Sequence, residues 1–148
     1  MQKAYKLSII YFIAFSLLLV VSAIMLFNHN IGFSIGEISQ YYLGNEEKFI
    51  ASKSWHGILK IILPHTFVFG LFAMVILHFL VFTKQRYKTS TLILIYIMFF
   101  TAFLEMASPF MIINNYEIFA YIKLVSFITF LSTILYTLWL LFHSIVYD

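Results

Sequence analysis

The chain has 148 residues, of which 63% are hydrophobic and only 10% charged, and its mean hydropathy is +0.98. Soluble domains carry about 25% charged residues, so this composition excludes a soluble globular protein. The net charge of +3 is too small to indicate nucleic-acid binding, and the absence of cysteine excludes disulfides, thiolate metal sites and covalently attached haem.

Four apolar segments each reach the roughly 20 residues that a helix needs to cross a bilayer. In chain order they are Leu7–Phe27, Ile58–Thr83, Thr91–Ile113 and Ile118–Val146. The sequence therefore predicts an all-α integral membrane protein whose residues 1–148 form one domain. The first segment also has features of a signal peptide. Its apolar stretch is longer than the usual run of about 7–15 residues, so we interpret it as a retained helix.

The connections between these segments predict an up-down-up-down bundle of four transmembrane helices. Tight turns join the second segment to the third and the third to the fourth, which makes each pair antiparallel neighbours. The long connection, residues 28–57, contains the capping-box pair Ser34 and Glu37, with Gly44 as a stop signal. This pattern predicts a short amphipathic helix on the outer membrane surface. An irregular loop is the alternative interpretation.

The distribution of basic residues predicts the orientation in the membrane. Lys3 and Lys6 precede the first segment, and three basic residues lie in the turn Lys84–Lys88. Cytoplasmic loops carry an excess of lysine and arginine. We therefore expect a multi-pass protein of the bacterial cytoplasmic (inner) membrane, with both termini in the cytoplasm.

His65 and His78 lie inside the second segment, where an ionisable side chain is costly and by default marks a functional site. They are about 20 Å apart along a helix axis. His29 ends the first segment at the outer side, and His143 lies near the end of the fourth at the inner side. The sequence thus predicts two imidazole pairs at two depths, His29 with His65 and His78 with His143.

This histidine layout resembles that of the small four-helix di-haem b-type membrane cytochromes. The resemblance implies one or two haem b groups with these four histidines as iron ligands, a quinone, and partner redox subunits. Two features depart from the family pattern. The spacing of His65 and His78 is one residue short, which rotates the two rings about 140° apart on a regular helix, and the third segment has no histidine.

Glu105 is a second ionisable residue at membrane depth, in the outer half of the third segment. It is expected near His65 and Lys60, and this trio can hydrogen-bond a quinone carbonyl and accept a proton from a quinol. Two structural alternatives remain open. Glu105 can instead bond a serine or tyrosine of the fourth segment, and Lys60 can extend to the membrane surface.

The favoured function is therefore that of a b-type cytochrome-like electron-transfer protein, or of the quinone-reactive anchor subunit of a redox complex. Any enzymatic role is at most that of an electron-transfer subunit in a quinone-linked oxidoreductase. Expected partners are the lipid bilayer and either redox subunits or further copies of the chain. The main alternative is a structural or assembly subunit without a cofactor. Copper handling by methionine and histidine is less favoured, because the methionines lack chelating spacing.

Overall fold

The computed structural model describes residues 3–83 and 87–147, and within them it contains five helices. Four are long and apolar enough to cross a membrane. These are α1 (Lys3–Asn30), α3 (Trp55–Val81), α4 (Thr89–Ile113) and α5 (Ile118–Tyr147), and the short α2 (Ile35–Leu43) lies between α1 and α3. The predicted all-α membrane fold is confirmed. Part of the predicted Lys84–Lys88 turn lies outside the described residues.

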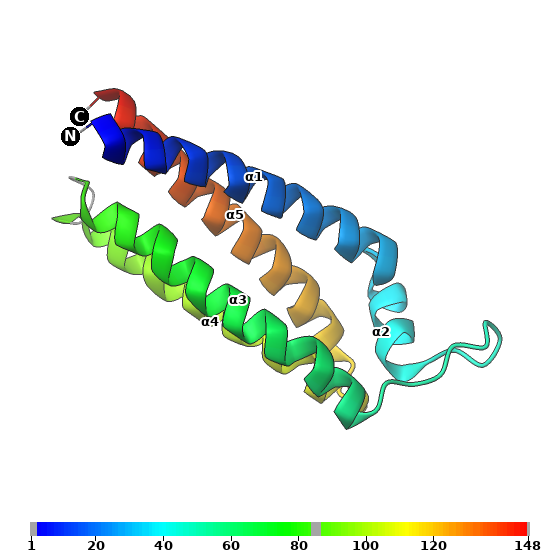
Figure 1. The fold of residues 1–148 in the computed structure, drawn as a ribbon. Helices are drawn as coiled ribbons and strands as arrows, with labels where there is room; N and C mark the ends of the chain where they lie inside the picture. The colour runs from blue at the N-terminus through cyan, green and yellow to red at the C-terminus, as the bar shows by residue number, and fades with distance from the viewer. Residues whose placement is uncertain (1–2, 84–86, 148) are drawn as a thin grey trace.

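The four long helices run alternately up and down (Figure 1), so both ends of the chain lie at one end of the bundle and α2 at the other. α3 packs beside α4, and α4 packs beside α5, as the two tight turns predict. At the end of the bundle that holds the termini, the Lys6 ammonium donates a hydrogen bond of 3.0 Å to the carbonyl of Ile145. This bond ties the start of α1 to the end of α5.

α5 is the central helix of the bundle. In its most apolar window 56% of the residues are buried, against 11% for α3. Its closest neighbour is α4, and both helices bury small or hydroxyl side chains that let membrane helices approach closely. Hydroxyls in both helices donate to the carbonyl four residues earlier, for example Thr137 to Thr133 at 2.8 Å. These polar side chains are thus satisfied inside their own helix.

Aromatic rings join α1 to α3 in the half of the bundle near the termini. Phe12 lies 5.8 Å from Phe72 and 4.9 Å from Phe79, centroid to centroid. Tyr5 adds edge contacts to Phe79 and Phe82 at 6.0 and 5.4 Å. In the other half of the bundle, toward α2, side chains of these two helices line a cavity instead of meeting in such ring contacts.

α2 forms for local reasons and then caps the bundle. The Ser34 hydroxyl accepts a hydrogen bond from the Glu37 backbone, and the Glu37 carboxylate accepts one of 3.0 Å from the Ser34 backbone. The Ser34 hydroxyl also donates a hydrogen bond of 2.8 Å to the Glu37 carboxylate, and this bond, with the one from the Ser34 backbone, holds the pKa of Glu37 below its ordinary value. Gly44, at φ 86°, ends the helix. Because Ile38 and Tyr42 are buried and α2 packs on α4 and α5, the loop alternative is wrong.

Candidate functional site

A buried ion pair joins α4 to α5 beneath the interfacial helix. The Lys123 ammonium of α5 contacts the Glu105 carboxylate of α4, and the two residues are only 4% and 9% exposed. A single charge at this depth would be strongly unfavourable, whereas a pair with further hydrogen bonds is tolerated. Glu105 is thus bonded to a side chain of the neighbouring helix α5. That side chain is a lysine, so the alternative interpretation with a serine or tyrosine partner is wrong.

Pro109 explains why the Lys123 ammonium bonds the backbone carbonyl of Glu105 as well as its carboxylate. Proline has no backbone N–H, so it cannot donate to the carbonyl four residues earlier, which is that of Glu105. The Lys123 ammonium supplies the missing donor, at 3.3 Å from the Glu105 carbonyl oxygen. One ammonium therefore satisfies both the side chain and the freed backbone carbonyl of the same residue.

Tyr42 of α2 covers the ion pair. Its ring centroid lies 5.9 Å from the Lys123 ammonium nitrogen, within the range of a cation–π contact. Burial, then the negative charge of Glu105 and the neighbouring Tyr41, raise the pKa of the Tyr42 phenol well above its ordinary value. The phenol therefore stays neutral and presents a polar O–H group at the end of the bundle that α2 closes.

The ion pair opens onto a cavity of about 450 Å³ in the α2 half of the bundle. This volume lies within the range of small-molecule sites, about 300–1,000 Å³. All five helices contribute to its wall, and most lining side chains are apolar. The titratable side chains in the lining are those of Tyr41, Tyr42, His65, Glu105 and Lys123. An apolar cavity with a few polar groups from different helices is typical of a ligand site.

His65 of α3 lines this cavity, and one of its ring nitrogens is hydrogen-bonded to the backbone of its own helix. Its Nδ1 lies 2.6 Å from the carbonyl oxygen of Ile61. A carbonyl oxygen only accepts, so Nδ1 carries the proton and Nε2 keeps a lone pair in the neutral ring. Nε2 can therefore accept a proton or bind a metal. A histidine whose Nδ1 is held by a backbone carbonyl is also the usual form of a metal ligand.

Lys60, the other lysine considered from the sequence, does not line the cavity. It precedes His65 by five residues, which places it about 140° around the same helix, and its side chain is exposed. Lys123 takes the place in the site that the sequence suggested for Lys60. Glu105 and His65 do line one cavity, at the same end of the bundle.

The remaining predicted haem ligands lie outside this cavity. Of the five histidines, all within the described residues, His65 alone lines it. His29 is exposed at the end of α1. His78 is exposed and packs on Phe82, centroids 5.0 Å apart, and His143 is exposed and lies 5.7 Å from Trp139. The pairings of His29 with His65 and of His78 with His143 stay predictions.

Sequence reasoning missed Lys123, although a signal for it was present. Glu105 precedes the end of α4 by eight residues, and Lys123 follows the start of α5 by five. Antiparallel helices joined by a tight turn bring such positions to similar depths, and the remaining offset is about 4.5 Å. A lysine side chain is long enough to span this offset. Opposite charges at matching depths on either side of a turn therefore indicate an ion pair.

The cavity brings together groups with complementary chemistry. Lys123 donates hydrogen bonds, the Glu105 carboxylate accepts them, and His65 offers an accepting nitrogen. The four long apolar helices and this cavity, with its few polar groups, define an integral membrane helical domain with a candidate small-molecule site.

Comparison with known proteins identifies the family of the chain. Residues 32–148 match a family of transmembrane helical domains, and the chain belongs to this family. The match covers α2 to α5, and so includes Tyr42, His65, Glu105 and Lys123, while α1 lies outside it. No curated protein and no solved structure matches the chain.

Proposed function

We propose that this protein is the quinone-reactive membrane subunit of a redox complex in the bacterial cytoplasmic membrane, with the α2 end of the bundle outward. The observation that carries the proposal is the buried Glu105–Lys123 pair, which faces a cavity of about 450 Å³ together with His65. A quinol head group is a flat, largely apolar ring with two hydroxyls that donate hydrogen bonds, and its oxidised form, the quinone, has two carbonyl oxygens that accept them. The quinol hydroxyls match the two acceptors in this apolar cavity, the Glu105 carboxylate and His65 Nε2, and a quinone carbonyl matches the donor Lys123.

The three groups have separate roles in quinol oxidation. The quinol loses two protons and two electrons, and the electrons pass to a partner redox subunit. His65 Nε2 and the Glu105 carboxylate each accept one proton, since both are acceptors within one cavity. When Glu105 is protonated, Lys123 remains as a buried cation. It then stabilises negative charge on the quinol oxygen that has lost its proton.

Binding of a tail-less quinol to the protein in lipid nanodiscs tests this proposal. Glu105→Gln is expected to weaken binding about 10- to 100-fold, because the hydrogen bond from a quinol hydroxyl to the charged carboxylate contributes about 1.5–3 kcal/mol. Lys60→Gln is the matched control, with an expected change below about twofold, because Lys60 lies outside the cavity. Equal affinity of the Glu105→Gln and wild-type proteins would refute the assignment.

The proposal includes one or two haem b groups, which would act as one-electron carriers. His65 suits an iron ligand because Nδ1 is bonded to a carbonyl and Nε2 has a lone pair; with iron bound there, Nε2 would not accept a quinol proton, so His65 serves one of the two roles. His29, His78 and His143 are the other proposed ligands. In a bundle, such groups are held by histidines from facing helices.

Visible spectra of the purified protein test the haem assignment. We expect a Soret band and sharp α-bands on reduction, and His78→Ala should remove one spectral component while the protein still inserts. His56→Ala is the control, since His56 is not among the proposed ligands, and it should leave the spectrum unaltered. A His78→Ala spectrum identical to that of the wild type would exclude the site proposed near the termini.

A structural or assembly subunit is the second candidate, and one observation favours it. Lys123 satisfies both the Glu105 carboxylate and the carbonyl that Pro109 leaves free, so the pair has a structural role even without a ligand. This candidate predicts a colourless protein that binds no quinone and depends on a partner for its accumulation.

A further inference from the structure

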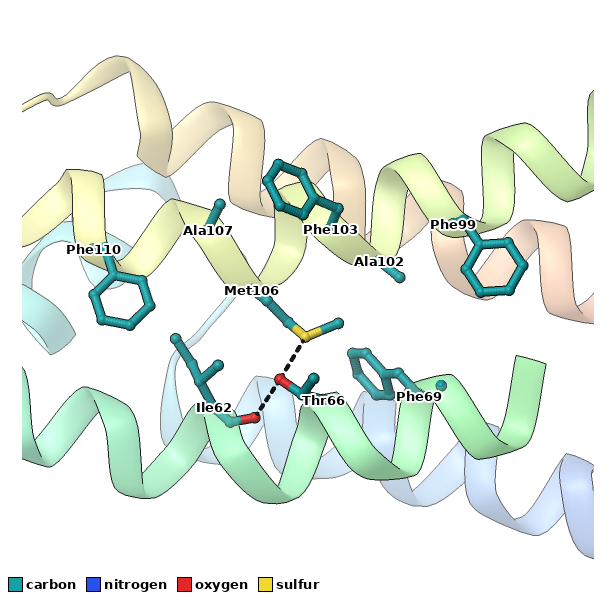
Figure 2. A pocket seen from close by; sticks show the side chains of 10 residues that line it. Ile62, Thr66, Phe69, Phe99, Ala102, Phe103, Met106, Ala107 and Phe110 are labelled. Carbon is teal, nitrogen blue, oxygen red and sulfur yellow. Dashed lines mark hydrogen bonds between the residues drawn. The ribbon is translucent and has the colours of Figure 1, made fainter. Parts of the chain in front are cut away.

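A second cavity, of about 520 Å³, lies between α3 and α4 (Figure 2). Its lining is almost entirely apolar, with aromatic rings such as that of Phe103. Its one hydroxyl, on Thr66, is already bonded to the Ile62 carbonyl at 3.0 Å and to the Met106 sulfur at 3.0 Å. The cleft therefore presents no polar group that requires a partner, and a purely hydrocarbon occupant suits it.

The cleft adjoins the polar cavity. Ile62, Phe69 and Met106 line both spaces, so their side chains form the wall between them. Glu105, the next residue to Met106, lies on the polar side. The Met106 side chain is unbranched and flexible, and its contact with Thr66 crosses from α4 to α3 (Figure 2). A rotation of this side chain would therefore open a passage between the cavity that contains Glu105 and the apolar cleft.

We infer that the α3–α4 cleft binds the isoprenoid tail of the quinone whose head group occupies the polar cavity. This inference rests on the proposed function. A membrane quinone consists of a polar head and a long apolar tail, and the two adjoining cavities match these parts in chemistry and order. A lipid acyl chain has the same hydrocarbon character, but only a quinone joins such a chain to a head group that can exchange protons with Glu105 and His65, which line the adjoining cavity.

Gly70 provides a way to block the cleft without disturbing the fold. It lines the cleft, and a Cβ atom added to it would meet nothing within 4 Å. A larger side chain at this helical position also removes the conformational cost of glycine. Gly70→Phe therefore fills the cleft. Leu71→Phe is the matched control, because Leu71 is 54% exposed and lines neither cavity.

The test compares a quinone that carries two isoprene units with its tail-less analogue in nanodiscs. The tail comes from lipid, not from water, so only packing in the cleft contributes to its affinity. We expect Gly70→Phe to weaken binding of the tailed quinone about tenfold and binding of the tail-less one less than about twofold. Leu71→Phe should alter neither, and thermal unfolding should show all three proteins folded.

Three outcomes would overturn the inference. Unchanged binding of the tailed quinone by Gly70→Phe would place the tail elsewhere, in bulk lipid or along α1. Equal weakening of both quinones would mean that position 70 acts on the head group. If the wild type does not bind the tail-less quinone at all, the proposed function fails with the inference. If the wild type binds the tail-less quinone, and Gly70→Phe binds the tailed quinone as tightly as the wild type does, only the tail site is refuted.

Discussion

Lys123→Met is expected to destabilise the protein by about 3–5 kcal/mol, the usual cost of removing one partner from a buried ion pair. The substitution leaves the Glu105 carboxylate, 9% exposed, without its cation. It also removes the donor to the backbone carbonyl that Pro109 leaves free. The free energy of unfolding, measured by denaturant titration in mixed micelles with circular dichroism, gives this value.

Two further variants make the result specific. Lys60→Met replaces an exposed lysine that lies outside the cavity and should change the free energy of unfolding by less than about 0.5 kcal/mol. The double variant Glu105→Met/Lys123→Met removes both charges and should be more stable than the single variant by about 2 kcal/mol. Its remaining deficit comes from the unmet carbonyl of residue 105. If Lys123→Met is as stable as the wild type, the ion pair is absent from the folded protein.

Tyr42→Ala is expected to release α2 from the end of the bundle. Tyr42 is 2% exposed, and deletion of a buried aromatic ring costs about 3 kcal/mol or more. A helix of nine residues does not persist alone in water, so α2 should open as a unit. Amide hydrogen exchange of residues 35–43, followed by mass spectrometry, should accelerate about 100-fold, the factor that corresponds to this energy.

A substitution that should stabilise α2, instead of destabilising it, serves as the control. Gly36 is exposed and a Cβ atom there meets nothing within 4 Å. Gly36→Ala should therefore stabilise the helix by about 0.5–1 kcal/mol and slow the exchange of the same residues. If Tyr42→Ala exchanges at the wild-type rate, α2 does not depend on its packing over Lys123.

The elements that could be predicted from the sequence are those specified by local properties. The length of each apolar segment determines the four membrane-spanning helices, and the boundaries differ from the structure by a few residues. The pair Ser34 and Glu37 defines the start of α2, and Gly44 its end, because capping depends on neighbours three residues apart. Tight turns alone make α3, α4 and α5 successive neighbours.

The contacts of the site could not be predicted in the same way, because they depend on how each helix is rotated about its axis. The depth of Glu105 and His65 followed from their positions along the chain, but the choice between Lys60 and Lys123 did not. Lys60 is exposed, while Lys123 is buried against α4. The link between Pro109 and Lys123 could not be predicted either, because it also depends on how α4 and α5 are rotated about their axes. A proline frees a carbonyl, and only the packed structure shows which side chain supplies the donor.

Infrared difference spectroscopy of a bound, ¹³C-carbonyl-labelled quinone shows whether the Glu105–Lys123 pair faces a quinone head group inside the bundle. We expect one labelled carbonyl stretch to move to lower frequency than in lipid alone, because the Lys123 ammonium donates a hydrogen bond to it. That shift should disappear in Lys123→Met. If both labelled carbonyls absorb at their lipid frequency in the wild-type protein, the quinone head group does not lie beside this ion pair.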